Sequence, residues 1–373
     1  MVHEMRPRRV GVVMAGGAGE RFWPLSRRHR PKQLLHLVDD RESMLEGAVR
    51  RIAPLIPPEH VYVVTGAHLV SSIREARIGI PEVNVIAEPC KRNTAGCLAY
   101  AAARLMATYG GDGDDLTMAV LTADHIIRDE PRFREAVQAA MNAAEACDAL
   151  ATLGLKPERP ETGYGYIEAE CDDTPSAANG PPGVRKVRAF CEKPDRERAE
   201  AFCRSGRHYW NSGMFFWRVA VFLEEMAAAA PHFERAIRGM TTALRANDEA
   251  EVRRLFEGLD DIAIDYALME RARHVVVVPA DFGWDDIGTW AKLDRGRAPD
   301  AAGNVLVGDP VAVDCTNSFI YNDAGARVAV GVVGVVDTVV IATEDAVLVV
   351  PKDRVQDVRA VVEELKRRDA PQR

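Results

Sequence analysis

From Arg9 to about Asp148, short apolar runs alternate with stretches of helical pattern, and this alternation constrains the fold more than any other feature of the chain. The runs RVGVVMA, VYVVTGA, VNVIAE and LTMAVLTAD are rich in β-branched residues, as buried strands are. Two intervening helices have recognisable starts, since Ser43 and Glu46 can form a capping box and Pro131 suits a first helical turn. The pattern predicts an α/β fold with a doubly wound, mainly parallel, Rossmann-like sheet.

From Ala149 to Trp290 the pattern is less regular, and we expect an elaboration of the same sheet. Strands are predicted at ATLGL, GYIEAE, VRKVRAFCEK and GMFFWRV, helices at 197–203, 219–229 and 265–273, and a loop from Cys171 to Val184. The aromatic residues Trp210, Phe215, Phe216 and Trp217 are expected in the core.

After Pro299 the sequence changes to short Val-rich strands separated by turns, followed by a predicted helix at 353–368. The change predicts two domains, a large α/β domain over residues 1–298 and a small β-rich, β-helix-like domain over residues 299–373.

Composition excludes several classes of protein. A net charge of -8 argues against nonspecific binding of nucleic acid, so we expect no nucleic-acid partner. The seven cysteines (90, 97, 147, 171, 191, 203 and 315) form no CxxC pair, which favours free thiols in a reducing compartment. The N-terminus lacks the pattern of a signal peptide and no apolar run is suited to spanning a membrane, so we expect a cytoplasmic protein without membrane contact.

The segment GGAGER, Gly16 to Arg21, follows the first predicted strand and is suited to binding phosphate. Its backbone N–H groups can cradle phosphate oxygens, Arg21 offers a planar fork, and Lys32 adds a point charge. It is not a dinucleotide fingerprint, because Phe22 stands where the third glycine belongs, and it lacks the GK[ST] of a Walker A loop. The alternative, an ordinary tight turn, leaves the spacing of Arg21 and Lys32 unexplained.

The stretch GGAGERFWPLSRRHRPKQ resembles the signature of the sugar-1-phosphate nucleotidyltransferases. Further motifs resemble the mannose-1-phosphate guanylyltransferase branch of that family and follow its order along nearly the whole chain: EPCKRNTAG, LTADH, TGYGYIE, EKP, WNSGMF, IDYALME and FGWDDIGTW. The resemblance implies a reaction that joins GTP and mannose 1-phosphate to give GDP-mannose and pyrophosphate. A phosphate monoester has a second pKa of about 6, so this nucleophile needs no general base.

The resemblance also implies the residues of the site. Arg21, Lys32 and Lys193 are the expected catalytic cations, and Gly165, Glu192 and Asn211 are expected to bind the sugar. The nucleotide would be bound by Ala15, Gly16, Gly17, Gly19, Glu88, Arg92, Asn93 and Thr94. Among these, the Glu88 carboxylate could accept the two adjacent N–H donors of guanine, whereas Asn93 or Thr94 could instead be a plain helix N-cap.

A Mg²⁺ ion is implied, with Asp124 and Asp286 as its protein ligands. Asp124 follows a predicted strand and so falls at the carboxyl edge of the sheet, where α/β proteins bind ligands, although a helix-capping aspartate is the alternative. Asp286 matches the family's metal position better than Asp285. His125 has no step to perform and is interpreted as structural.

The sequence departs from the family pattern at Gly96 and Thr122, where the family usually or often has proline. Two other functions stay open: the same chemistry on another sugar 1-phosphate, such as a manno-heptose 1-phosphate, and a non-catalytic regulatory relative that binds nucleotide sugar. The resemblance further implies a homodimer. Because the chain stops at residue 373, we expect neither the isomerase half of longer, bifunctional relatives nor a second activity.

Overall fold

The computed structural model describes residues 8–17, 19–39, 41–170, 182–293 and 297–373. The predicted loop from Cys171 to Val184 lies outside the described residues except for its last three, and so does Cys171 itself. The other cysteines are free thiols, as expected. In the described part of the chain, no helix combines the length and apolarity needed to cross a bilayer.

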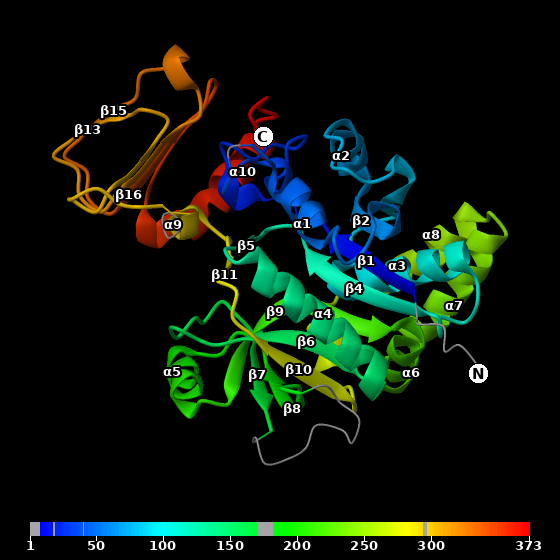
Figure 1. Cartoon of the computed structure of the whole chain (residues 1–373). Helices are drawn as coiled ribbons and strands as arrows, with labels where there is room; N and C mark the ends of the chain where they lie inside the picture. The colour runs from blue at the N-terminus through cyan, green and yellow to red at the C-terminus, as the bar shows by residue number, and fades with distance from the viewer. Residues whose placement is uncertain (1–7, 18, 40, 171–181, 294–296) are drawn as a thin grey trace.

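A nine-stranded sheet forms the centre of the molecule, in the order β3-β2-β1-β4-β9-β6-β10-β8-β7 (Figure 1). In that order the strands are Val85–Glu88, Val61–Gly66, Arg8–Met14, Leu116–Thr122, His208–Arg218, Leu150–Leu155, Val275–Ala280, Arg185–Cys191 and Tyr166–Ala169. The first four strands pair in parallel, which confirms the doubly wound half predicted from the alternating pattern. The elaboration joins the same sheet through β9, which runs antiparallel to both β4 and β6, while β6 and β10 are parallel.

Helices cover both faces of the sheet because successive strand residues point to opposite sides. Val10 and Val12 of β1 pack with α3 (Asn93–Tyr109), α6 (Val219–Ala229), α7 (Pro231–Arg245) and α8 (Glu249–Glu257). Val13 packs on the other face with α1 (Met44–Ile52), α2 (Val70–Glu75) and α4 (Glu130–Cys147). The expected core aromatics Trp210, Phe215, Phe216 and Trp217 are all buried.

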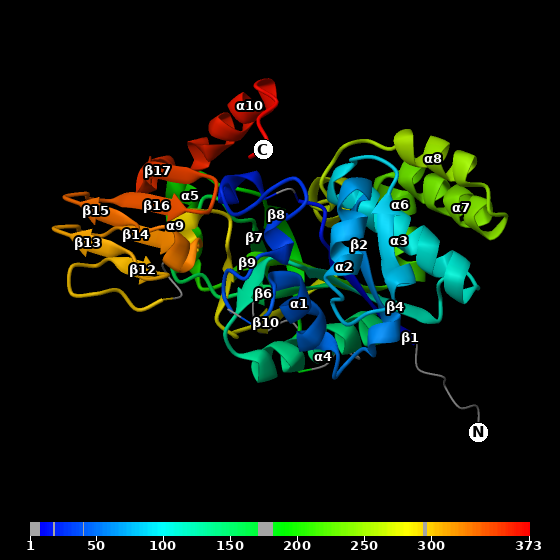
Figure 2. The same cartoon turned by 90° about the horizontal axis from the view of Figure 1, so that it is seen from above.

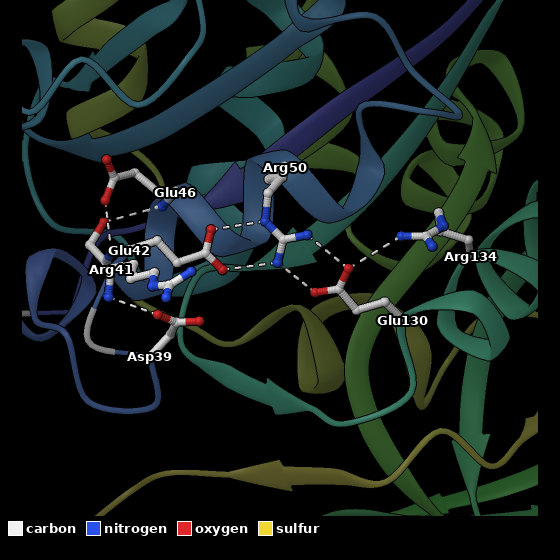
Figure 3. Close-up of polar contacts among 8 residues, drawn as sticks. Asp39, Arg41, Glu42, Glu46, Arg50, Glu130 and Arg134 are labelled. Atoms are coloured by element: carbon white, nitrogen blue, oxygen red, sulfur yellow. Dashed lines mark hydrogen bonds and ion pairs between the residues drawn. The ribbon is translucent and has the colours of Figure 1, made fainter.

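Both helix starts predicted from the sequence are present: α1 follows its cap Ser43, and Pro131 lies in the first turn of α4. The capping box is present, because Glu46 N donates to Ser43 Oγ over 3.3 Å and Ser43 N donates to Glu46 Oε2 over 2.7 Å. Figure 3 shows how Arg50 then ties α1 to α4. Its guanidinium donates to both carboxylate oxygens of Glu42, each at 2.9 Å, and to those of Glu130 at 2.8 and 2.5 Å.

The helix predicted at 265–273 is wrong in type and extent, because the chain makes only a π-helical turn, Asp265–Met269 (η6). Tertiary hydrogen bonds hold this turn on both sides: Ile264 N donates to Thr94 Oγ1, and Asp265 Oδ1 accepts from Asn211 Nδ2, each over 2.8 Å. The helices α7 and α8 were not predicted. The helix predicted at 219–229 is confirmed as α6, and the one at 197–203 lies within α5 (Arg196–Ser205).

The C-terminal part of the chain forms a small β-helix-like unit, as predicted. The parallel strands β12 (Val305–Val307), β14 (Phe319–Asn322) and β16 (Thr338–Ala342) stack in one sheet, and β17 (Val347–Pro351) adds an antiparallel edge. A second pair, β13 (Val311–Val313) and β15 (Gly331–Val333), is also parallel. Figures 1 and 2 place this unit at the opposite end of the molecule from α7 and α8.

The last helix is shorter than predicted. The segment Lys352–Asp357 (η9) is a 3-10 helix, and the α-helix α10 runs only over Val358–Arg367. Both views show α10 beside the blue segment that follows β1 (Figures 1 and 2), and Val358 and Val362 share an apolar core with Phe22 and Trp290. The C-terminal unit is therefore packed against the glycine-rich segment.

Candidate active site

The glycine segment turns sharply at the carboxyl end of β1. Gly19 has φ 64°, and a Cβ there would lie 2.4 Å from the Cβ and 2.9 Å from the backbone N of Lys32, so only glycine fits this close approach. Gly17 O accepts a hydrogen bond from Gln33 Nε2 over 2.8 Å. These contacts hold the segment 31–33 against the glycines and bring Lys32 to the loop.

A cavity of about 400 Å³ lies over this segment. Its walls include six of the predicted site residues: Gly17, Gly19, Arg21, Lys32, Asp124 and Asp286. Two further cations, Lys91 and Arg359, also line it. The structure thus brings together the predicted phosphate-binding and metal-binding groups, which come from widely separated parts of the sequence.

Lys32 and Asp124 form an ion pair in this cavity. Lys32 Nζ lies 2.8 Å from Asp124 Oδ2 and donates a longer bond, 3.3 Å, to the Asp124 backbone carbonyl. The Lys32 side chain is only 5% exposed, whereas that of Asp124 is 34% exposed. Burial opposes ionisation of Asp124, but the positive charges of Lys32 and His125, together with the hydrogen bonds that the carboxylate accepts, outweigh it and hold the pKa of this carboxyl below its usual value.

Asp286 reaches the cavity through a two-stranded pairing. β5 (His125–Ile127) and β11 (Trp284–Asp286) run antiparallel, and Asp286 lies opposite His125, the residue after Asp124. A Cβ on Gly288 would lie 3.5 Å from Arg21 Nη1 and 3.8 Å from Asp286 Oδ2, which places both groups around one glycine. Arg21 Nη1 also donates to Gly288 O over 3.1 Å.

Asp285 has a different environment from its neighbour. It is 3% exposed and accepts hydrogen bonds from Tyr164 Oη over 2.6 Å and from Arg159 Nη2 over 3.1 Å. The carboxylate of Asp285 accepts hydrogen bonds inside the protein, whereas that of Asp286 lines the cavity.

The donor set of the cavity fits a hard divalent cation. Carboxylate oxygens are preferred ligands of such ions, and Mg²⁺ is usually held by one or two carboxylates together with substrate phosphates and water. No group of three or more His, Cys, Asp or Glu side chains suited to a metal occurs among the residues described here. Asp124 and Asp286 could therefore hold a metal whose other ligands come from phosphate and water.

The predicted sugar-binding residues form a second cluster. A Cβ on Gly165 would lie 2.5 Å from Glu192 Oε2 and 3.3 Å from Asn211 Cβ, and Asn211 N donates to Gly165 O over 2.8 Å. Lys193 pairs with Glu192 and keeps a largely exposed side chain. The four residues lie together, and the side chains of Glu192, Lys193 and Asn211 supply one acceptor, one cation and one amide for a polyhydroxylated anion.

Asp265 belongs to this cluster and was missed by the sequence analysis. It accepts from Asn211 Nδ2 over 2.8 Å, and burial, reinforced by the negative charge of Glu192, raises its pKa to about 6. The motif IDYALME contains it, but the sequence alone does not reveal that this half-buried carboxyl lies near that of Glu192.

The residues expected to bind the base differ in how far other parts of the protein already engage their side chains. Glu88 lies against the glycine segment, since a Cβ on Gly16 would be 3.4 Å from Glu88 Oε2, and burial raises its pKa to about 7. Arg92 is engaged by the protein itself, because it donates to Glu257 O over 2.5 Å and to Lys91 O over 3.0 Å. Glu88 is thus the predicted base-binding residue whose carboxylate stays beside the loop without a hydrogen bond among the described residues.

Neither Asn93 nor Thr94 is the N-cap that the alternative interpretation required. The N-cap position of α3 falls on Arg92 and has no side-chain capping bond. Thr94 Oγ1 accepts from Ile264 N over 2.8 Å, and Asn93 Oδ1 accepts from the adjacent Thr94 N over 2.9 Å.

Gly96, the first departure from the family pattern, lies under Arg92. A Cβ on Gly96 would lie 2.4 Å from Arg92 Cβ, so glycine at this position lets Arg92 pack over the helix.

His125 makes structural contacts, as interpreted. Its Nδ1 accepts from Trp284 Nε1 over 3.1 Å and lies 2.5 Å from Thr122 Oγ1. Thr122, the second departure from the family pattern, therefore helps to orient the imidazole next to Asp124.

A glycine segment at the carboxyl end of a parallel sheet, with two cations beside two carboxylates, defines a nucleotide-handling transferase site. Residues 10–301 match the family model described as nucleotidyl transferase, and residues 308–365 match a MannoseP isomerase/GMP-like beta-helix domain. The chain therefore belongs to the nucleotidyl transferase family. Members of this family generally use a divalent metal.

Similar proteins cover almost the whole chain. It is 41% identical over 363 residues to a mannose-1-phosphate guanylyltransferase of Escherichia coli (strain K12), a match that covers 95% of this chain and 73% of that protein. It is 37% identical over 366 residues to the alginate biosynthesis protein AlgA of Pseudomonas aeruginosa, with coverage of 95% and 72%. A crystal structure described as mannose-1-phosphate geranyltransferase from Thermus thermophilus is 35% identical, superposes with a TM-score of 0.83, and is matched over 96% of this chain and 99% of that one.

Proposed function

We propose that this protein transfers GMP from GTP to mannose 1-phosphate, giving GDP-mannose and pyrophosphate. One observation carries the proposal: Arg21, Lys32, Asp124 and Asp286 line a single cavity at the glycine segment. The similarity to mannose-1-phosphate guanylyltransferases over nearly the whole chain supports the choice of substrates.

In this reaction an oxygen of the sugar phosphate attacks the α-phosphorus of GTP, and the bond from that phosphorus to the oxygen bridging to the β-phosphate breaks. The electron pair of the broken bond leaves with pyrophosphate. The sugar phosphate is largely dianionic at neutral pH, because its second pKa is about 6, so no protein group needs to remove a proton. The protein's part is to align two anions that repel each other and to stabilise the charge that moves.

The phosphate groups would be bound by the glycine segment and its cations. We assign Ala15, Gly16, Gly17 and Gly19 to backbone contacts with the nucleotide, and Arg21 and Lys32 to the transferring phosphates. The close approach at Gly19 supports this assignment, because the missing side chain lets Lys32 pack directly against the loop that would hold the phosphates. Among Glu88, Arg92, Asn93 and Thr94, the position of Glu88 beside Gly16 makes it the favoured reader of guanine.

The metal in this proposal is Mg²⁺, with Asp124 and Asp286 as its protein ligands. When bound, it would neutralise part of the charge on the transferring phosphates. The ion pair of Lys32 with Asp124 orients the carboxylate and keeps it ionised, which is the state a metal ligand needs.

The sugar would lie against the second cluster. Gly165, Glu192 and Asn211 would bind hydroxyl groups, and Lys193 would bind the phosphate of mannose 1-phosphate. The amide of Asn211 is held on both sides, because its Nδ2 donates to Asp265 and its Oδ1 accepts from Gly213 N, so it would meet the sugar in a fixed orientation. This orientation distinguishes sugars by a few hydrogen bonds, so another sugar 1-phosphate is the principal competing substrate.

We also propose a division of the chain into a catalytic domain, 1–298, and a β-rich domain, 299–373, and a homodimer acting in the cytoplasm. The exposed valines Val311, Val313 and Val333 on β13 and β15 support a contact between two copies through the C-terminal unit.

Incubation with each nucleoside triphosphate and a panel of sugar 1-phosphates, followed by chromatography of the nucleotide sugars, tests the proposal. GTP with mannose 1-phosphate should give the highest kcat/KM. A preference for UTP, dTTP or ATP over GTP by about tenfold, equivalent to about 1.4 kcal/mol, would show that the guanine assignment is wrong. Absence of product in every combination would favour the non-catalytic relative.

A further inference from the structure

The helix α10 supplies a wall of the cavity at the glycine segment. Arg359, its second residue, lines the cavity together with Arg21, Lys91 and Gly288. It belongs to the C-terminal part of the chain, which the proposed reaction has not used so far.

Apolar packing and one ion pair fix α10 on the glycine segment. Val358 and Val362 are one helical turn apart and pack in the same core as Phe22, which directly follows Arg21. Further along the helix, Lys366 Nζ lies 2.7 Å from Glu20 Oε1, on the other side of Arg21 in the chain. Arg359 is therefore held beside Arg21 by contacts to both of Arg21's neighbours.

The cavity contains positive charge that the protein does not neutralise. Among the residues that the structure describes, neither Lys91 nor Arg359 has a hydrogen-bonding or ion-pair partner for its side chain. Burial lowers the pKa of Arg21, and the positive charge of Arg359 lowers it further. Two guanidinium groups that face one cavity repel each other unless an anion lies between them.

The position of Arg359 selects which phosphates it can reach. The cavity that it lines includes Gly17 and Gly19 but none of Gly165, Glu192 and Asn211. Arg359 therefore faces the glycine segment and not the sugar cluster. Several cations line this part of the cavity, which favours an anion with several negative charges, such as the terminal phosphates of a nucleoside triphosphate.

We propose that Arg359 binds the β- and γ-phosphates of the triphosphate, so that the C-terminal helix completes the active site. This inference rests on the proposed function. As the bond to the α-phosphorus breaks, the electron pair stays on the bridging oxygen of pyrophosphate, and Arg359 donates hydrogen bonds to that leaving group.

The arginine has a matched control on the same helix. Arg367 is also exposed, but it pairs with Glu364 of α10 and does not line the cavity. Arg359→Ala should raise KM for GTP, and KM for pyrophosphate in the reverse reaction, by about ten- to hundredfold, the usual value of a charged hydrogen bond. KM for mannose 1-phosphate should change less than about twofold. Arg359→Lys should restore part of the loss, and Arg367→Ala should behave as the unsubstituted protein.

Calorimetric titration with inorganic pyrophosphate in the presence of Mg²⁺ tests the inference without turnover. Weaker binding in Arg359→Ala, partial recovery in Arg359→Lys and no change in Arg367→Ala, all with unchanged Tm, would support it. Equal affinity in all variants would overturn it, as would an equal rise in KM for the sugar phosphate. If Arg359 governs pyrophosphate binding but no nucleotide sugar is formed, the proposed function fails while this inference stands.

Discussion

Asp124 and Asp286 line one cavity although they lie in distant parts of the chain, because β11 pairs with β5 and sets Asp286 opposite the residue that follows Asp124. Two carboxylates so close to a triphosphate are unfavourable without a cation, since like charges oppose ionisation. The pairing of two three-residue strands therefore has a direct consequence for metal use.

We expect Asp124→Asn and Asp286→Asn each to raise the Mg²⁺ concentration needed for half-maximal turnover and to lower kcat strongly. The double variant should be little worse than the poorer single one, because groups that act as a unit are not additive. Turnover measured against Mg²⁺ concentration checks both statements.

Asp285→Asn is the control for this pair. Since Asp285 accepts hydrogen bonds from Tyr164 and Arg159 in the interior, its substitution should lower Tm and leave the Mg²⁺ requirement unchanged. Additive losses in the double variant, or a larger shift in Mg²⁺ requirement at Asp285 than at Asp286, would contradict the metal assignment.

Arg21→Ala should reduce kcat more than it raises KM. A guanidinium held in place by Gly288 O is most useful when charge redistributes on the transferring phosphate. The loss of one such preorganised contact costs roughly two to three orders of magnitude, about 3–4 kcal/mol. Steady-state kinetics separates the two parameters, and a raised KM with normal kcat would reduce Arg21 to a docking residue.

Gly19→Ala should impair both stability and activity. At φ 64° a Cβ strains the backbone by about 1–2 kcal/mol, and here it would also meet Lys32 at 2.4 Å. Gly79→Ala isolates the strain alone, because Gly79 has φ 85° and a Cβ there would point into open space, with no contact within 4 Å. Both variants should lose stability in denaturant unfolding, whereas only Gly19→Ala should lose turnover; equal turnover in both would refute a role for the close contact.

Glu88→Gln should change how stability depends on pH. Burial raises the pKa of Glu88 to about 7, so the native state favours the neutral carboxyl. The contribution of this neutral carboxyl to the free energy of unfolding is fully present below the unfolded pKa of about 4.3 and is lost as the pH rises through the folded pKa. Glutamine cannot ionise, so its free energy of unfolding does not fall in this way. The difference in unfolding free energy between variant and parent should therefore grow in the variant's favour from pH 5 to pH 8, by at most about 3 kcal/mol.

Urea unfolding at those two pH values, without nucleotide, measures the difference. Glu75→Gln serves as the control, because Glu75 is exposed on α2. A stability difference between Glu88→Gln and the parent that is the same at both pH values would show that Glu88 ionises normally in the folded protein.

Val311→Lys and Val333→Lys test the proposed dimer. These valines are exposed on adjacent strands β13 and β15, where a lysine disturbs no core but would place charge in a contact between copies. Light scattering should report a dimer for the parent and a monomer for the double variant. A parent that is monomeric at every concentration would remove the dimer from the proposal.

The sequence predicted those features that depend on local pattern. The strands β1 to β4 follow from Val-rich runs, and the capping box at Ser43 follows from spacing alone. The gathering of Arg21, Lys32, Asp124 and Asp286 was also predictable, because strand ends in a parallel sheet share one edge and the motifs resemble those of a known family.

Features that depend on tertiary packing were not predictable in this way. The position of Asp265 beside Asn211 arises from a π-helical turn held by hydrogen bonds to Asn211 and Thr94, which are far from it in the chain. Arg359 reaches the cavity only because α10 packs on Phe22. Neither residue stands out from its neighbours in charge or spacing, so no periodicity marks it.

The apolar core that joins Phe22, Trp290 and Val358 has a consequence for unfolding. The ring centroids of Phe22 and Trp290 lie 5.2 Å apart, and Trp290 Nε1 donates to Trp23 O over 3.1 Å. Detaching the β-helix-like unit would expose these aromatic rings and release the segment that carries Arg21. Two family models match separate parts of the chain, but we expect these parts to unfold together. The phosphate-binding segment and the C-terminal unit should open to solvent in the same hydrogen-exchange event.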